Sequence, residues 1–381
     1  MLYPGAHPLD PAKAVAQSKL HAAVGLTSAR QLSFEVHLSL PAPSLSNDKA
    51  SMRDSFRGAV LQLQALNRQD MSRVNETILE NMQSSVALIP QMAEHLIAAG
   101  GKRLRPLLTL SAARGLGYDA DRHIHLAAAV ELIHAATLLH DDVVDESALR
   151  RGAKTANIIW GNKESVLVGD FLFSRAFELM VKTEDLRVLD ILSNASGIIA
   201  EGEVMQLSTQ KNIAATQDMY LNVIKAKTAA LFAAATRAGA VIAGASPTHE
   251  QALYTYGLHL GIAYQMVDDA LDYAGSEVAL GKSVGDDFKE GKMTLPVVLA
   301  LQAADAKETS FWTRTISDGA QEDEDFTMAC ALMARHGTVE KTLSRARTHA
   351  DTAVQALEIL PNTQHFDALI DLADLSVGRV S

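Results

Sequence analysis

Two aspartate-rich segments are the residues of this chain whose types and spacing most directly suggest chemistry. They are Asp141-Asp142-Val143-Val144-Asp145 and Asp268-Asp269-Ala270-Leu271-Asp272, and both have the form DDxxD. On a helix, the first and last aspartates of each segment share one face, where like charges repel each other. Both segments end apolar stretches with a helical period, where carboxylates also oppose the helix dipole. A divalent cation bound by these carboxylates would relieve both costs.

Magnesium suits such a site. It prefers oxygen ligands and typically takes one or two carboxylates together with phosphate oxygens of a substrate. The sequence therefore predicts two carboxylate faces that hold metal ions between them and bind one diphosphate. A solvated acidic helix end could explain a single segment, but it is a poor explanation for two copies on apolar helices.

Basic residues that could bind phosphate occur close to these segments. Gly100-Gly101 precedes Lys102 and Arg105, at a helix start whose free N–H groups favour anions. Arg150-Arg151 follows the first aspartate segment, and paired arginines can hold a diphosphate through bidentate bonds. Either pattern can also be an ordinary basic turn, so each indicates a phosphate site only in combination with the aspartate segments nearby.

Three further features could also belong to a phosphate-binding site. Lys227-Thr228 lies on an apolar helix, where an unpaired lysine is costly unless it reaches the surface. His134 lies seven residues before Asp141, two turns away on nearly the same face, which makes it a candidate phosphate donor. The Gly- and Lys-rich loop of residues 281–292 has the composition of a lid over bound phosphate, or of a solvated loop.

Composition limits the class of protein. The chain has 381 residues, 48% of them apolar, and a formal net charge of −11, which argues against nucleic acid as a partner. The single cysteine, Cys330, excludes an internal disulfide. We find no charge-free stretch of membrane-spanning length and no secretory signal, so we expect no transmembrane segment.

The elements that must position these residues are helices. A helical period runs from Arg53 onward, with no alternating strand pattern and no βαβ rhythm. We expect an all-α protein: a large single-domain antiparallel bundle over residues 51–381, preceded by an extension over residues 1–50, most simply a mobile tail. The expected helices cover residues 74–99, 105–115, 122–146, 165–182, 186–209, 217–239 and 250–274, followed by a helical region from 295 to 380.

Taken together, these segments resemble the trans-isoprenyl diphosphate synthase (polyprenyl synthetase) family. The matching segments are GGKRLRP at 100–106, LLHDDVVDESALRRG at 138–152, GDFLFSRAF at 169–177, Lys227-Thr228, YQMVDDALDYAG at 264–275 and GKSVGDDFKEGKMTLP at 281–296. The sequences of these segments are most similar to those of the long-chain octaprenyl, solanesyl and decaprenyl diphosphate synthases.

The resemblance implies the isoprenoid synthase fold, helices around a deep central cavity, and a Mg²⁺-dependent prenyltransferase (with Mn²⁺ as a possible substitute). The enzyme would add isopentenyl diphosphate repeatedly to an allylic diphosphate such as farnesyl or geranylgeranyl diphosphate. It would act as a homodimer in the cytoplasm, or in mitochondria if residues 1–50 are a transit peptide. The alternatives are a shorter-chain geranylgeranyl synthase and a non-catalytic subunit of a heteromeric synthase, which usually lacks one aspartate motif.

The resemblance also assigns roles to residues. Asp141, Asp145 and Asp268 would ligate magnesium directly, supported by Asp142, Asp269 and Asp272. The allylic diphosphate would be bound by Arg150, Lys227, Lys282 and Lys292, with Thr228 and Gln265 near its reacting carbon. Isopentenyl diphosphate would be bound by Lys102, Arg105, His134 and Arg151.

Product length should be set below the first aspartate motif. Ala136 and Thr137 lie about one helical turn before Asp141, roughly 6–7.5 Å along the axis, and Ile133 lies further down the same side. Both Ala136 and Thr137 are small, whereas in this family an aromatic residue at the level of Ala136 is associated with short products. We therefore expect a product of about C40 to C50, as used for quinone side chains.

Overall fold

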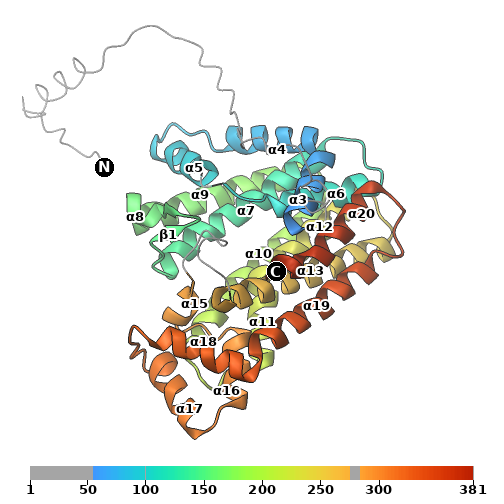
Figure 1. Cartoon of the computed structure of the whole chain (residues 1–381). Coiled ribbons are helices and arrows are strands. Elements are labelled where there is room, and N and C mark those ends of the chain that lie inside the picture. Colours follow the sequence, from blue (N-terminus) through green and yellow to red (C-terminus); the bar gives the residue numbers. More distant parts are fainter. Residues whose placement is uncertain (1–54, 99, 275–283, 381) are drawn as a thin grey trace, which may run out of the picture. The chain divides into compact units, whose positions relative to one another are not determined.

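The computed structural model describes residues 55–98, 100–274 and 284–380, and its elements are labelled in Figure 1. Nearly all regular structure in these ranges is helical, which confirms the predicted all-α class. None of these helices combines the length and the low charge that a bilayer-crossing segment requires. The predicted extension over residues 1–50 and Lys282 of the predicted lid lie outside the described residues.

The helices follow one another with short connections. The N-terminal series is α3 (Phe56–Leu66), α4 (Arg68–Asn81), α5 (Leu88–Ala98), α6 (Leu104–Gly115), α7 (Arg122–Val144), α8 (Ala156–Trp160), α9 (Asn162–Lys182) and α10 (Leu186–Thr209). The C-terminal series is α11 (Gln217–Ile224), η1 (Lys225–Ala229), α12 (Ala230–Ile242), α13 (Pro247–Ala274), α15 (Asp286–Lys289), α16 (Leu295–Ala303), α17 (Ala306–Trp312), η2 (Thr313–Ser317), α18 (Asp325–His336), α19 (Thr338–Ala356), α20 (Gln364–Ser376) and η3 (Val377–Val380).

Two predicted helices differ from the structure in detail. The helix expected over residues 74–99 is divided into α4 and α5, and between them the Ser84 hydroxyl accepts a hydrogen bond from the Val86 N–H. Serine side chains that bond to nearby backbone compete with helix in this way. The helix expected over 217–239 is interrupted by η1, a π-helical turn in which the Ala230 N–H donates to the Lys225 carbonyl.

A small hairpin follows α7 and was not predicted. Strands β1 (Leu149–Arg150) and β2 (Ala153–Lys154) pair antiparallel, with Arg150 opposite Ala153. The two turn residues, Arg151 and Gly152, have φ values of 55° and 80°, as a type I′ turn requires. Strands of two residues are too short to show an alternating pattern, so periodicity could not reveal them.

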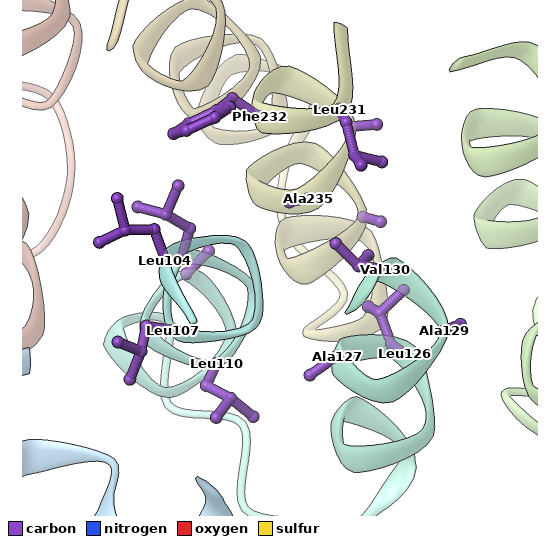
Figure 2. Packing of buried hydrophobic residues seen from close by; sticks show 14 of the residues in the cluster. Leu104, Leu107, Leu110, Leu126, Ala127, Ala129, Val130, Leu231, Phe232 and Ala235 are labelled. Carbon is purple, nitrogen blue, oxygen red and sulfur yellow. The ribbon is translucent and has the colours of Figure 1, made fainter. Parts of the chain in front are cut away.

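Helix α12 is buried on almost every side and packs against α6, α7, α10 and α13. Figure 2 shows its side chains Leu231 and Phe232 among buried residues of α6 and α7, such as Leu107 and Val130. Burying each of these large apolar side chains contributes about 1.5–3 kcal/mol. Small residues bring the helices close together: a Cβ at Gly257 of α13 would lie 2.3 Å from Thr236 Oγ1 of α12.

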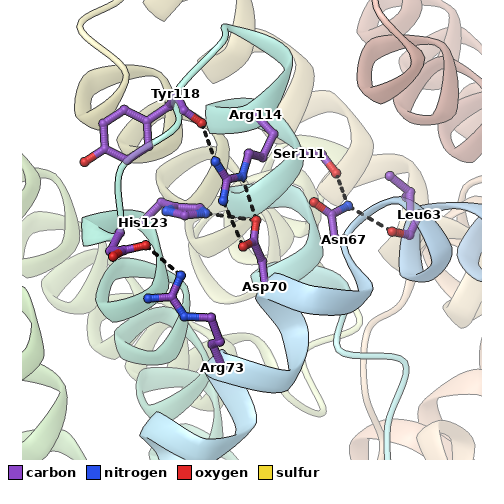
Figure 3. A network of polar contacts seen from close by, with 9 residues as sticks. Leu63, Asn67, Asp70, Arg73, Ser111, Arg114, Tyr118 and His123 are labelled. Atoms are coloured by element: carbon purple, nitrogen blue, oxygen red, sulfur yellow. Dashed lines mark hydrogen bonds and ion pairs between the residues drawn. The ribbon is translucent and has the colours of Figure 1, made fainter.

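A buried ion-pair network ties α4 to α6 and α7 (Figure 3). Arg114 of α6 donates two hydrogen bonds to Asp70, of 2.7 and 2.9 Å, and His123 Nε2 of α7 lies 3.0 Å from the same carboxylate. Burial alone would raise the pKa of Asp70, but the bonds from Arg114 and His123 lower it from 3.8 to about 2. The carboxylate is therefore ionised and stabilises the folded state.

We predict that Asp70→Asn destabilises the protein, because it leaves the partly buried Arg114 without its counter-charge. Removing one partner of a buried pair costs about 3–5 kcal/mol, which urea unfolding followed by circular dichroism would measure. Asp121→Asn is the matched control, since the pair between Asp121 and Arg73 in the same region is exposed. An exposed pair is worth at most about 1 kcal/mol.

The pH dependence gives a second readout of the same variant. A carboxylate whose pKa is lowered by folding contributes its full stability above its unfolded pKa, and loses it as the pH falls through the folded value. The stability difference between wild type and Asp70→Asn should thus be constant above about pH 4 and shrink towards pH 2. A difference that persists undiminished at pH 2 would contradict the assignment.

Candidate active site

The first aspartate motif forms the last turn of α7, with Asp145 as its C-terminal cap. Asp142 points to one side, is 2% exposed and accepts two bonds from the Arg150 guanidinium at 2.8 and 2.7 Å. Its backbone carbonyl accepts a hydrogen bond from Asn157 of α8. Asp142 therefore fastens the hairpin and α8 to the end of α7, while Asp141 and Asp145 occupy other sides of the turn.

Asp141 lies among several charges. Burial raises its pKa to about 7, the carboxylates of Glu203 and Asp145 also raise it, and Lys227 and Arg150 oppose the shift. Carboxylates crowded in this way repel each other and favour a nearby cation. The end of α7 is thus a place where negative charge has been concentrated at a cost.

Lys227 and Thr228 are presented by the π-helical turn η1, and such turns often occur at functional sites. Lys227 Nζ donates to Glu203 Oε2 of α10 at 2.7 Å. The neighbouring Gly202 allows this approach, since a Cβ there would lie 2.8 Å from the Lys227 backbone N. Glu203 was not among the residues predicted from the sequence. The glycine that precedes it, Gly202, was the sequence feature that could have indicated a close helix contact there.

The second aspartate motif forms the end of α13. Asp269 is 4% exposed, and both of its oxygens accept hydrogen bonds, from Tyr220 at 2.6 Å and from Gln265 at 2.7 Å. Burial raises the pKa of Asp269, as do Asp287 and Asp268, and the two hydrogen bonds oppose this shift. Asp272 is fully buried and accepts from the Asp287 N–H, so it anchors the segment that follows.

Lys292 links the two motifs. Its Nζ lies 3.7 Å from Asp145 of the first motif and 3.7 Å from Asp287, the residue anchored to the second motif, and it also pairs with Glu290. Burial lowers the pKa of Lys292, but the three carboxylates outweigh burial and raise it above its ordinary value. Lys292 is therefore charged, and it connects the end of α7 to α15, which Asp272 at the end of α13 holds through the Asp287 N–H.

A cleft with a volume of about 370 Å³ lies at the side of the first motif. Its walls come from the end of α7, the end of α10 and the segment around α15: Val144, Asp145, Glu146, Gln210, Lys211, Lys289 and Glu290. In the described ranges, no three acidic, histidine or cysteine side chains converge as a preformed metal cage. Magnesium needs only one or two carboxylates when phosphate and water complete its shell, so the donors present fit that ion.

A cluster of basic residues lies further along α7. The Arg151 guanidinium lies beside Gly101, where a Cβ would be 2.6 Å from its Nη1, so the hairpin turn reaches the Gly-Gly segment. Arg103 pairs with Glu131 of α7, and Arg105 lies over the Phe232 ring, 4.6 Å from its centroid. Arg103, Glu131, His134 and Arg151 are among the residues that line a small cavity of about 30 Å³.

The basic cluster shifts the titration of its members. Burial lowers the pKa of Arg105 to about 10, with Arg151 adding to the effect. Burial, followed by the charges of Arg105, Arg151 and other arginines, lowers the pKa of His134 well below its ordinary value. His134 is therefore neutral, and the guanidinium groups carry the positive charge.

The other predicted residues are placed as follows. Lys102 is exposed, with its Nζ 4.7 Å from the centre of the Phe56 ring, at the outer side of the basic cluster. Thr228 donates to Gln265 Oε1 at 2.9 Å. Ala136 and Ile133 are fully buried in α7, and the Thr137 hydroxyl donates to the His134 carbonyl. Asp268 is partly buried at the end of α13. The structure thus brings together the acidic and basic residues that the sequence singled out, except Lys282, which lies outside the described part.

Comparison with known proteins agrees with this geometry. Residues 86–333 match the family model for polyprenyl synthetase. The octaprenyl diphosphate synthase of Haemophilus influenzae is 45% identical over 318 residues, which is 84% of this chain and 96% of the relative. Two crystal structures match with 53–54% identity over 84% of this chain. One is a polyprenyl synthase from Caulobacter crescentus complexed with calcium and isoprenyl diphosphate, matched over 98% of its length with a TM-score of 0.82. The other is a decaprenyl diphosphate synthase from Rhodobacter capsulatus, matched over 99% with a TM-score of 0.81.

These relatives share the all-α isoprenoid synthase fold, and they confirm the resemblance that the motifs indicated. The chain belongs to the polyprenyl synthetase family and is a prenyltransferase of the long-chain, all-trans polyprenyl diphosphate synthase type.

Proposed function

We propose that this enzyme adds isopentenyl diphosphate repeatedly to a farnesyl or geranylgeranyl diphosphate primer, giving a product of about C40 to C50. The observation that supports this most strongly is the link that Lys292 makes between the two aspartate motifs. Lys292 contacts Asp145 of the first motif and Asp287, whose N–H bonds to Asp272 of the second motif, and a separate basic cluster lies along α7. One substrate diphosphate needs metal ions and the other needs fixed cations, and the two regions supply them separately.

In our proposal, Asp141, Asp145 and Asp268 bind Mg²⁺, for which Mn²⁺ can substitute. Bound metal would neutralise the charge that develops on the departing diphosphate. Asp142, Asp269 and Asp272 support the ligands from behind, because protein donors already bond to their oxygens. Arg150, Lys227 and Lys292, which pair with acidic residues at or near the motifs, bind the allylic diphosphate together with Lys282 of the predicted lid.

We assign isopentenyl diphosphate to the basic cluster. Arg105 and Arg151 supply charge without titrating near neutral pH, and neutral His134 can donate one ring N–H to a phosphate oxygen. Lys102 reaches the phosphate from the outer side. Guanidinium groups suit this role because they bind phosphate oxygens in pairs.

We also propose that the enzyme is a homodimer. Helices α9 and α10 are neighbours and expose large apolar side chains, among them Leu167 (67%), Val181 (64%) and Val204 (68%). Exposed apolar patches of this kind mark interaction sites. A second copy of the chain is the partner that the family resemblance implies. Our proposal places the dimer in the cytoplasm, and a mitochondrial address would require a transit signal within residues 1–50.

The first test is direct. Purified protein incubated with farnesyl diphosphate, labelled isopentenyl diphosphate and Mg²⁺ should yield products of about C40 to C50 on reversed-phase chromatography. Chelation with EDTA should stop the reaction and added Mg²⁺ should restore it.

Asp141→Asn should lower kcat about a thousandfold, because a metal ligand is worth several kcal/mol. Asp190→Asn, an exposed aspartate of α10, is the matched control and should leave kcat unchanged. The proposal would be contradicted if wild-type protein made no elongated product.

The second test concerns product length. Ala136 has no exposed surface and lies one turn deeper than Asp141, so a larger side chain there fills the space into which the product would grow. Ala136→Phe should shorten the main product by several isoprene units, and Ala136→Val should shorten it less, as mass spectrometry of the products would show. If folded Ala136→Phe protein still makes full-length chains, the floor lies elsewhere.

The third test concerns the dimer. Val204→Glu places a charge within the exposed apolar face of α10 and should convert the dimer to a monomer in sedimentation equilibrium. Met328→Glu is the control, because Met328 is also exposed (52%) but lies on α18, away from that face. Loss of the dimer in both variants, or in neither, would rule out this interface.

A further inference from the structure

Four side chains from three elements form one continuous hydrogen-bonded chain at the second aspartate motif. Tyr220 of α11 donates to Asp269 Oδ2 at 2.6 Å, and Gln265 Nε2 of α13 donates to Asp269 Oδ1 at 2.7 Å. Thr228 of η1 donates to Gln265 Oε1 at 2.9 Å. The chain begins at a buried tyrosine, 5% exposed, and ends at a threonine that is only partly buried.

The chain has a fixed direction. With Asp269 ionised, its carboxylate accepts at both oxygens, so the amide of Gln265 turns its NH₂ towards Asp269 and its carbonyl towards Thr228. A hydroxyl has one proton to donate and two lone pairs. Because the proton of Thr228 is used by Gln265, only the lone pairs of its oxygen remain for a further partner.

We infer that Tyr220 and Asp269 are positioning residues that orient the Thr228 hydroxyl so that its lone pairs face the reacting carbon of the allylic substrate. This inference rests on the proposed function. When the C1–O bond of the substrate breaks, its electron pair leaves with the diphosphate and positive charge develops on C1. The π electrons of isopentenyl diphosphate then form the new C–C bond, and the proton lost passes to the released diphosphate. An oxygen that presents lone pairs stabilises the charge on C1, whereas a hydroxyl free to rotate would spend part of its time presenting its proton.

Tyr220 is suited to hold the far end of the chain. Its ring is packed in the core, and its hydroxyl bonds to a carboxylate that burial would otherwise destabilise. Replacing the hydroxyl with hydrogen leaves Asp269 with Gln265 as its remaining side-chain donor among the bonds described above. The carboxylate and the amide could then turn, and the Thr228 proton would no longer be fixed.

The test is a double-mutant cycle with Tyr220→Phe and Thr228→Val. The quantity measured is kcat, with each diphosphate and Mg²⁺ saturating. We expect Tyr220→Phe to lower kcat about tenfold, the effect of one hydrogen bond. The KM for both diphosphates and the Mg²⁺ concentration for half-maximal rate should stay within about twofold of wild type. The double variant should be no slower than Thr228→Val, because Tyr220 acts only through Thr228.

The matched control is Tyr256→Phe. Tyr256 is also buried in the core, and its hydroxyl donates to the Leu369 carbonyl of α20 at 2.7 Å, away from the chain. This variant should leave kcat unchanged and should combine multiplicatively with Thr228→Val. Thermal unfolding reports whether each variant is folded, and if Tyr220→Phe is not, the cycle of Gln265→Leu with Thr228→Val takes its place with the same expectation.

Multiplicative effects of Tyr220→Phe and Thr228→Val on kcat would overturn the inference, since they would mean that Tyr220 acts independently of Thr228. A large rise in the Mg²⁺ requirement of Tyr220→Phe would overturn it as well, because Tyr220 would then serve the metal ligands. In both cases the wild type still elongates its substrate and the proposed function stands. A wild type without condensation activity would instead remove the proposed function itself.

Discussion

The arrangement of the site is constrained by the repulsion among the carboxylates that lie at the ends of α7 and α13. Burial, together with the carboxylates of Glu203 and Asp145, raises the pKa of Asp141 to about 7, and Lys292 balances Asp145, Glu290 and Asp287. An arrangement with this much like charge is costly for a folded protein. In our proposal, the same charges attract divalent cations, which a diphosphate substrate then shares. Lys227 and Lys292 pair with these carboxylates and would transfer to phosphate when the substrate binds.

The helical core supplies the rigidity that this repulsion demands. Glycines at 202, 257 and 261 remove the Cβ atoms that would otherwise clash between α10, η1, α12 and α13, with closest approaches of 2.3 to 2.8 Å for an added Cβ. Close packing of this kind resists small displacements. The buried motif residues Asp142, Asp269 and Asp272 use hydrogen bonds to tie the motif ends to the hairpin, to Tyr220 and to α15. Packing and polar bonds thus hold the acidic side chains together.

Much of this was predictable from the sequence, because the helical period and the aspartate spacing are local patterns. The two DDxxD segments, the Gly-Gly basic segment and Lys227-Thr228 were all singled out, and the structure places them around neighbouring regions. Glu203 and Tyr220 were missed because their partners, Lys227 and Asp269, are distant in sequence. The π-turn at η1 leaves the apolar pattern of a continuous helix intact, so periodicity alone gave no sign of it. The roles assigned to the site residues and the division at residue 50 stay predictions.

Helix α7 connects the two halves of the site and so constrains how both substrates bind. His134 of the basic cluster and Asp141 of the first motif are seven residues apart on one face, which is about 10.5 Å along the helix. In the proposed arrangement, a diphosphate at each position leaves a gap in which a C5 unit and the reacting end of the allylic chain would meet. The apolar tail would leave this gap past the small residues Ala136 and Thr137. A single helix would then fix the separation of the two phosphate sites and, through the residues between them, the course of the growing product.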